Sequence, residues 1–124
     1  MFEGEVVSGK GSGKKYLALP WVRSQIKEKL GYAPFLGTLN LKLNADSVKL
    51  KERLAKANSL MICPAEGYCL GLVFHANVDN LDCAVVVPKV EGYPKDMLEV
   101  IAKVNLRERL HLKDGDPVMV KVAL

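Results

Sequence analysis

Short stretches of alternating apolar and polar residues run along most of this chain. Residues 39–44 (Leu-Asn-Leu-Lys-Leu-Asn) alternate strictly, which predicts a strand with one buried face. Residues 84–87 (Ala-Val-Val-Val) form a continuous apolar run that suits a strand buried on both faces. The other strands expected from the pattern span residues 2–8, 16–19, 59–62, 68–77, 82–88 and 117–123.

Helical spacing of apolar residues is confined to four segments. Pro20 opens the first, which Gly31 ends, and Asp46 can cap a second, lysine-rich one through Ala57. A second clear helix is expected from Pro94, with inward-facing Met97, Leu98, Ile101 and Ala102 around Glu99, and a short one over residues 106–110. Strands and helices do not alternate regularly, so the pattern favours a mainly β fold, a small barrel with two or three short helices.

Composition limits the class of protein further. With 124 residues, 49% hydrophobic and 26% charged, the chain is expected to form a single domain over residues 1–124, not a disordered tail or a fibre. The weakly charged stretch 59–74 holds Pro64 and Glu66 and is too short to cross a bilayer. The acidic N-terminus does not resemble a signal peptide, and three cysteines fit reduced thiols better than a disulfide framework. We therefore expect a cytoplasmic protein without a membrane partner.

The first candidate site is a glycine-rich segment, Gly9-Lys10-Gly11-Ser12-Gly13-Lys14, followed by Lys15. Alternating glycines let backbone N–H groups turn toward one point, and the lysines add positive charge, as in a phosphate-binding loop. The spacing matches neither the P-loop nor the dinucleotide-binding fingerprint. A hairpin tip with solubilising lysines is the alternative for this segment.

The second candidate lies on the polar face of the strand at residues 39–44. Thr38, Asn40 and Lys42 share that face. Two neutral oxygen ligands beside a lysine can hold a hydrated Mg²⁺ whose other ligands are phosphate oxygens. An ordinary solvent-exposed strand face is the alternative.

The third candidate is Val104-Asn105-Leu106-Arg107-Glu108, at the start of the expected short helix. Its backbone amides can receive the polar edge of a ligand, and Arg107 adds positive charge. Alternatively, Asn105 is a helix cap and Arg107 and Glu108 form a solvated pair. Glu99, between apolar neighbours, can point toward a cleft.

Taken together, these segments resemble the archaeal CTP-dependent riboflavin kinases. The resemblance rests on the glycine loop, Pro34-Phe35-x-Gly-Thr-Leu-Asn-Leu, Val86-Val87-Pro88, Leu98-Glu99-Val100-Ile101-Ala102, and Asn105-Leu106-Arg107-Glu108 followed by Leu112-Lys113-Asp114-Gly115-Asp116. It implies a compact six-stranded cradle-loop barrel. It also implies transfer of the γ-phosphoryl group of CTP to the 5′-hydroxyl of riboflavin, which gives FMN and CDP.

The resemblance also implies roles for individual residues. The loop from Gly9 to Lys14 and residues Asn105, Leu106, Arg107 and Glu108 would bind the nucleotide, Thr38 and Asn40 would bind Mg²⁺, and Glu99 would contact the flavin. Glu91 stands where the family usually has a Thr that is expected to contact the flavin, and we do not assign that role to Glu91. No residue stands out as a general base. A monomer is expected.

The net charge of +4 (Lys+Arg 18, Asp+Glu 14) leaves a second class of function open. Residues 106–116 also resemble the core of swapped-hairpin transcription regulators, small basic proteins that bind DNA. Only four of the basic residues are Arg, which is few for reading base edges. A barrel that binds flavin or nucleotide without catalysis is a third option. If the chain is a kinase, the lysines of the glycine-rich loop are expected to bind a triphosphate, and no nucleic acid is expected as a partner. The remaining lysines are then expected to form ordinary surface.

Overall fold

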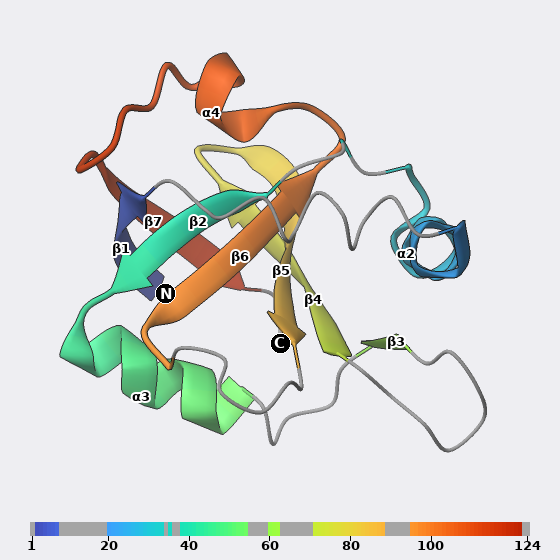
Figure 1. The fold of residues 1–124 in the computed structure, drawn as a ribbon, viewed down its shortest axis with the longest axis horizontal. Helices are drawn as coiled ribbons and strands as arrows, with labels where there is room; N and C mark the ends of the chain where they lie inside the picture. Colours follow the sequence, from blue (N-terminus) through green and yellow to red (C-terminus); the bar gives the residue numbers. More distant parts are fainter. Residues whose placement is uncertain are drawn as a thin grey trace.

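The fold was examined in a computed structural model that describes residues 2–7, 20–33, 35, 38–54, 60–62, 71–88 and 95–122. In chain order its elements are β1 (Phe2–Val7), α2 (Pro20–Leu30), β2 (Leu39–Leu43), α3 (Ala45–Leu54), β3 (Leu60–Ile62), β4 (Gly71–Val78), β5 (Leu81–Pro88), β6 (Met97–Ala102), α4 (Leu106–Arg109) and β7 (Pro117–Val122). Figure 1 shows α3 and α4 at opposite ends of the sheet. Within the described residues, no helix has the length and apolar character needed to span a membrane.

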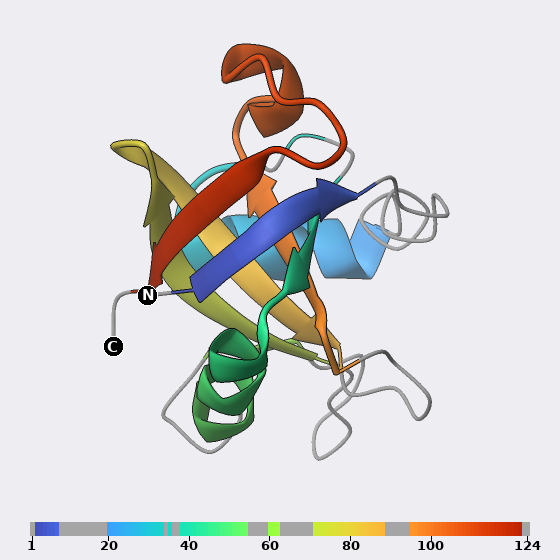
Figure 2. The same cartoon turned by 90° about the vertical axis from the view of Figure 1, so that its left-hand side faces the viewer.

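Six antiparallel strands close into a barrel. Around the ring they run β4-β5-β6-β2-β1-β7, and β7 returns to β4 through the pairs Ala76–Val122 and Asn77–Lys121. The short β3 pairs with β4 outside this ring. Figure 2 shows β1 and β7 side by side, with the other strands curving behind them. This closed six-stranded barrel with three helices confirms the predicted fold class.

The barrel interior is apolar because each strand turns alternate residues inward. Along β2 the side chains of Leu39, Leu41 and Leu43 are buried, whereas Asn40 and Lys42 lie on the outer face. The strictly alternating pattern therefore predicted both the strand and its orientation. In β5 every residue from Cys83 to Val87 is buried, as the continuous apolar run indicated. Cys83 is a buried free thiol.

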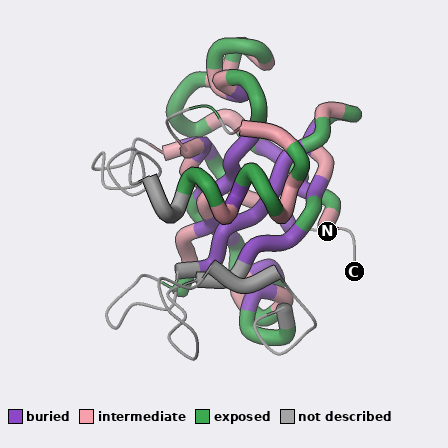
Figure 3. The backbone as a smooth tube through the Cα atoms, turned by 90° about the vertical axis from the view of Figure 1, so that its right-hand side faces the viewer, coloured by how far each residue is buried: buried purple, intermediate pink, exposed green. Residues whose placement is uncertain are grey.

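Helix α2 accounts for the burial of the outward side of β5. It lies across the outer face of the strands (Figure 3), and its Ile26 is fully buried. Ala84 and Val86 alternate with the inward-facing residues of β5, and Ile101 lies opposite Ala84 on β6. All three are buried. The barrel thus has a second apolar layer on one side, and polar side chains remain on the outer face elsewhere.

The helix predicted from Pro94 is wrong: Met97–Ala102 form strand β6. The spacing of Met97, Leu98 and Ile101 suits a helix, but it is compatible with a strand whose two faces are covered by different layers. Leu98 faces the barrel interior, and Ile101 faces the outer layer. Pairing with both β2 and β5 and the β-branched Val100 and Ile101 favour the strand. Glu99 therefore lies in a strand and not in mid-helix.

The helix ends were predicted with mixed success. Gly31 ends α2 with a φ of 82°, and its N–H donates to the carbonyl of Lys27, as expected for a glycine C-cap. The cap of α3 is Asn44 and not Asp46: the Asn44 Oδ1 accepts from the Ser47 N–H at 2.9 Å. Because the cap and the start of α3 lie two residues earlier than predicted, Asp46 lies inside the first turn. The strand expected over residues 16–19 lies outside the described residues.

The assignment of β6 to the core can be tested by truncation. Leu98 is 0% exposed, so Leu98→Ala should lower the free energy of unfolding by about 2–5 kcal/mol. Met119 on β7 is 53% exposed, and Met119→Ala should change it by no more than about 0.5 kcal/mol. Urea denaturation followed by the fluorescence of Trp21 measures both. Equal losses for the two variants would contradict the inward orientation of Leu98.

Candidate functional site

Three oxygen-bearing side chains meet on the outer face of the barrel where β2 and β6 pair. Asn40 lies directly opposite Glu99 in the antiparallel register. The hydroxyl of Thr38 lies 3.0 Å from Asn40 Oδ1 and 3.4 Å from Glu99 Oε1. All three side chains are partly buried. The two residues predicted to bind Mg²⁺ and the one predicted to contact the substrate therefore lie together.

The chemistry of this cluster suits a hard cation. A threonine hydroxyl has a single proton, so it satisfies one of the two acceptors at a time, and amide and carboxylate oxygens each carry more than one lone pair. Carboxylate, amide and hydroxyl oxygens are the ligands that Mg²⁺ takes, often only one or two from the protein. The donors present fit the predicted metal.

A pocket of about 150 Å³ opens beside Thr38. Asn105, Leu106 and Arg107 line it together with Thr38, so the structure brings the third sequence candidate next to the second. Leu106 is 3% exposed and anchors this segment in the core. Glu108 is exposed and is not one of the lining residues.

Two apolar residues of this pocket belong to the candidate segments found in the sequence, but no role was assigned to them there. Phe35 and Val104 both line it, although their side chains are 41% and 36% exposed. The Phe35 N–H donates to the carbonyl of Ala102 at 2.7 Å, which holds the segment after α2 against β6. Exposed apolar groups around a polar site favour the binding of a flat ring. Phe35 belongs to the motif Pro34-Phe35-x-Gly-Thr-Leu-Asn-Leu, on which the resemblance partly rests. Its place in that motif was the signal that could have identified it as a site residue.

The alternative readings of the 105–108 segment are partly correct. Asn105 does cap α4: its Oδ1 accepts from the Glu108 N–H at 3.1 Å. Arg107 pairs with Asp114 at 2.7 Å and not with Glu108. The two side chains of this pair are 40% and 57% exposed, so it contributes at most about 1 kcal/mol, and a phosphate group can compete with Asp114 for the guanidinium.

Lys51 of α3 is a charged group that the sequence analysis assigned to ordinary surface. Its side chain is only 8% exposed, and its Nζ donates to the carbonyl of Met97 at 2.6 Å. Burial lowers the pKa of Lys51, and the negative charges of Asp96 and Glu99 act in the opposite direction. Lys51 therefore adds positive potential at the end of β6, two residues from Glu99. Ser47, which is also buried, lies four residues before Lys51, so the two share one face of the helix. This spacing was the signal in the sequence that could have indicated the burial of Lys51.

The glycine-rich loop, Gly9 to Lys14, lies outside the described residues, and so does Glu91. Lys42 is exposed and shares the outer face with Asn40, opposite Glu5 on β1. The described part of the site therefore consists of the β2–β6 cluster, the pocket beside α4 and the lysines near them.

The fold is a closed β-barrel, and the polar candidate residues Thr38, Asn40 and Glu99 lie together on its outer face where β2 and β6 pair. Residues 6–122 match the model of the family CTP-dep_RFKase, described as "Domain of unknown function DUF120". The chain belongs to this family.

Several curated proteins are similar to the chain along almost its whole length. A riboflavin kinase of Archaeoglobus fulgidus is 40% identical over 98% of the chain and 54% of its own length. Riboflavin kinases of Methanosarcina mazei and Ignicoccus hospitalis are also 40% identical, over 97% of the chain and 55% and 69% of their own lengths. The chain thus spans about half the length of the first two relatives.

The buried position of Lys51 predicts a pH dependence of stability. Because burial lowers its pKa from the ordinary value of 10.5, the folded protein releases this proton at a lower pH than the unfolded chain does. Between the two pKa values the unfolded state binds more protons, so stability rises with pH. The free energy of unfolding of the unmodified protein, minus that of Lys51→Met, should increase as the pH approaches 10.5.

Urea denaturation of both proteins between pH 7 and 10.5 measures this difference. Lys49→Met, on the exposed side of the same helix, controls for the loss of one positive charge. A difference between the unmodified protein and Lys51→Met that is independent of pH would contradict the proposed effect of burial.

Proposed function

We propose that this chain is a CTP-dependent riboflavin kinase, which transfers the γ-phosphoryl group of CTP to the 5′-hydroxyl of riboflavin and forms FMN and CDP with Mg²⁺. Membership of the family and the relatives named riboflavin kinase support the acceptor. The family's name supports CTP as the donor.

The observation that carries this proposal is the convergence of Thr38, Asn40 and Glu99 on one point of the barrel surface. A kinase needs a cation beside the triphosphate and an acceptor hydroxyl in line with the γ-phosphorus. Two neutral oxygen ligands next to a carboxylate meet both needs, since Thr38 and Asn40 would hold Mg²⁺ and Glu99 would accept a hydrogen bond from the flavin substrate. Binding without catalysis would not require the first two.

The reaction requires little covalent chemistry from the protein. The 5′-oxygen of riboflavin forms a bond to the γ-phosphorus while the bond from that phosphorus to the β–γ bridging oxygen breaks. The hydroxyl proton is lost, and CDP carries away the electron pair. Bound Mg²⁺ would neutralise charge on the phosphate oxygens.

The protein's part in this reaction is positioning and charge. Asn105, Leu106, Arg107 and Glu108, together with the loop Gly9, Lys10, Gly11, Ser12, Gly13 and Lys14, are the proposed nucleotide-binding residues. We assign no general base, because no residue of the site stands out for that role.

The alternative of a DNA-binding regulator rested on residues 106–116 alone. The family match extends over residues 6–122, including the β2 and β6 segments that such a regulator would not need. The kinase reading therefore uses more of the chain. A barrel that binds the same ligands without catalysis remains a possible outcome of the assay below.

Turnover is the direct test. Incubation of the protein with riboflavin, Mg²⁺ and CTP should give FMN and CDP in equal amounts, detected by chromatography, and ATP in parallel reactions should give much less product. Chelation of the metal with EDTA should stop the reaction. No FMN with any nucleoside triphosphate would refute the kinase proposal.

Substitution at the oxygen cluster tests the site assignment. Thr38→Val keeps the shape of the side chain but removes its oxygen, and Glu99→Gln keeps the size but removes the charge. Each should lower kcat/KM by at least about tenfold, since loss of a metal ligand or its partner typically costs that much or more. Glu52→Gln, an exposed carboxyl on α3, is the matched control and should retain full activity. Full activity of Thr38→Val would show that the metal lies elsewhere.

A further inference from the structure

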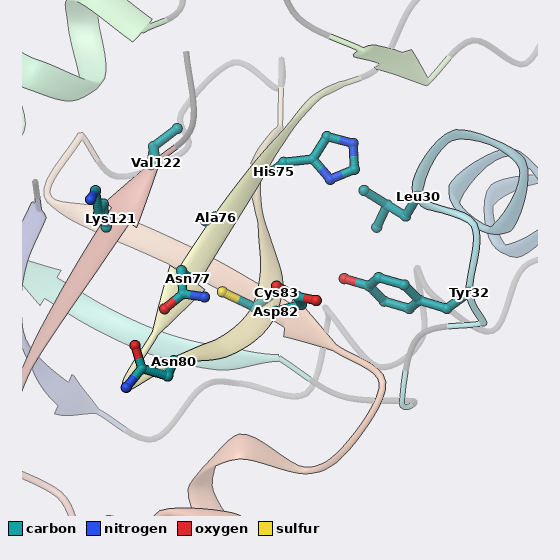
Figure 4. A pocket seen from close by; sticks show the side chains of 10 residues that line it. All are labelled: Leu30, Tyr32, His75, Ala76, Asn77, Asn80, Asp82, Cys83, Lys121 and Val122. Carbon is teal, nitrogen blue, oxygen red and sulfur yellow. The ribbon is translucent and has the colours of Figure 1, made fainter.

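A second cavity lies apart from the proposed catalytic site. It has a volume of about 670 Å³ and opens on the outer face of the barrel between β7, β4, β5 and the C-terminal end of α2 (Figure 4). It shares no lining residue with the pocket beside Thr38. Cavities of this size accommodate small molecules.

A row of polar residues crosses the floor of this cavity. Lys121 of β7 lies opposite Asn77 of β4, which in turn lies opposite Asp82 of β5. Because neighbouring strands are about 4.8 Å apart, the positive and negative members of the row are separated by roughly 10 Å at the backbone. The row offers a positive donor, an amide and a negative acceptor, and its two charges cancel.

Tyr32 forms the opposite wall together with Leu30. Its hydroxyl is buried and has no hydrogen-bond partner among the residues described, and Figure 4 shows the phenol ring directed toward Asp82. Burial first, and then the nearby Cys83 and Asp82, raise the pKa of Tyr32 to about 12. The group therefore keeps its proton at physiological pH and can act as a donor. A buried hydroxyl without a partner is costly, and few such groups occur in folded proteins.

We propose that this cavity is a second binding site, which takes an uncharged molecule of nucleoside size bearing both hydrogen-bond donors and acceptors. After a small rotation of the phenol ring that uncovers it, the Tyr32 hydroxyl would donate a hydrogen bond to an acceptor of the ligand, and a donor of the ligand would reach the carboxylate of Asp82. Because the row carries one charge of each sign, it gives neither a phosphorylated nor a cationic ligand a net attraction that would compensate for the lost hydration of the ligand's charge. The site is thus complementary to a different class of ligand from the triphosphate proposed above.

The choice of ligand class follows from two features that act together. The cavity volume of about 670 Å³ gives room for a molecule much larger than a single water or a small ion. The absence of net charge in the polar row removes the electrostatic attraction that a nucleotide site needs. Neither feature depends on the kinase proposal.

Nuclear magnetic resonance of the ¹⁵N-labelled chain tests the proposal with riboflavin, cytidine and adenosine as probes and CMP as their charged counterpart. At least one uncharged probe should shift the amide resonances of Tyr32, Asn77 and Asp82, and CMP should not. Tyr32→Phe and Asp82→Asn should each weaken that binding about five- to tenfold, the effect of one lost hydrogen bond. Tyr32→Phe should also leave the Tm unchanged or raise it, because it removes the unpartnered hydroxyl.

Two controls separate this site from the catalytic one. Asp79→Asn makes the same chemical change in the turn next to Asp82, at a residue with a φ of 50° that does not line the cavity, and Asn tolerates that conformation. This variant and Thr38→Val should bind the probe as the unmodified protein does. The proposal is overturned if no uncharged probe shifts these resonances, if the shifts are confined to the surroundings of Thr38, or if Tyr32→Phe and Asp82→Asn bind normally. None of these readouts requires turnover.

Discussion

Backbone hydrogen bonding between β7 and β4 closes the ring of strands, and the arrangement of the other elements follows from that closure. A closed ring leaves no unpaired edge among its six members. It also divides every strand into an inward and an outward set of side chains. The inward set must be apolar because the interior is filled by side chains such as Leu41, Leu98 and Val120, all fully buried. Polar chemistry is therefore restricted to the outer face and to the ends of the barrel.

The location of the candidate site is a consequence of this division. Because apolar residues occupy the inward positions of β2 and β6, Asn40 and Glu99 point outward, and the antiparallel register sets them opposite each other. Thr38, just before β2, then brings its hydroxyl within hydrogen-bond distance of both. The same core packing that stabilises the barrel brings Glu99 to Thr38 and Asn40, from which it is far apart in the sequence. The core residue Leu106 adds the α4 segment to this region.

Helix α3 joins the far end of the barrel through polar contacts as well as apolar ones. The Ser47 hydroxyl accepts from the Glu3 N–H on β1, and the Lys51 ammonium donates to the Met97 carbonyl on β6. The helix covers these backbone groups at the ends of two strands and so removes them from water. The two hydrogen bonds replace the bonds to water that the groups have lost. They also place a positive charge near Glu99. The structural anchor of α3 thereby contributes to the electrostatic potential of the candidate site.

The sequence by itself determined most strands, the first helix and its glycine cap, because period-two alternation and cap chemistry are local properties of the chain. It also indicated Thr38 and Asn40 as a pair, since residues two apart on a strand share a face. Glu99 and the segment from Asn105 to Arg107 were also singled out in the sequence and received their roles through the resemblance to a family, but their positions beside Thr38 were beyond the sequence pattern. The tertiary structure decided that Met97–Ala102 form a strand, because two partners and two apolar layers outweigh a spacing that also suits a helix. It likewise decided the burial of Lys51 and the cavity beside Tyr32, because both depend on which distant elements pack together, and no local pattern encodes that.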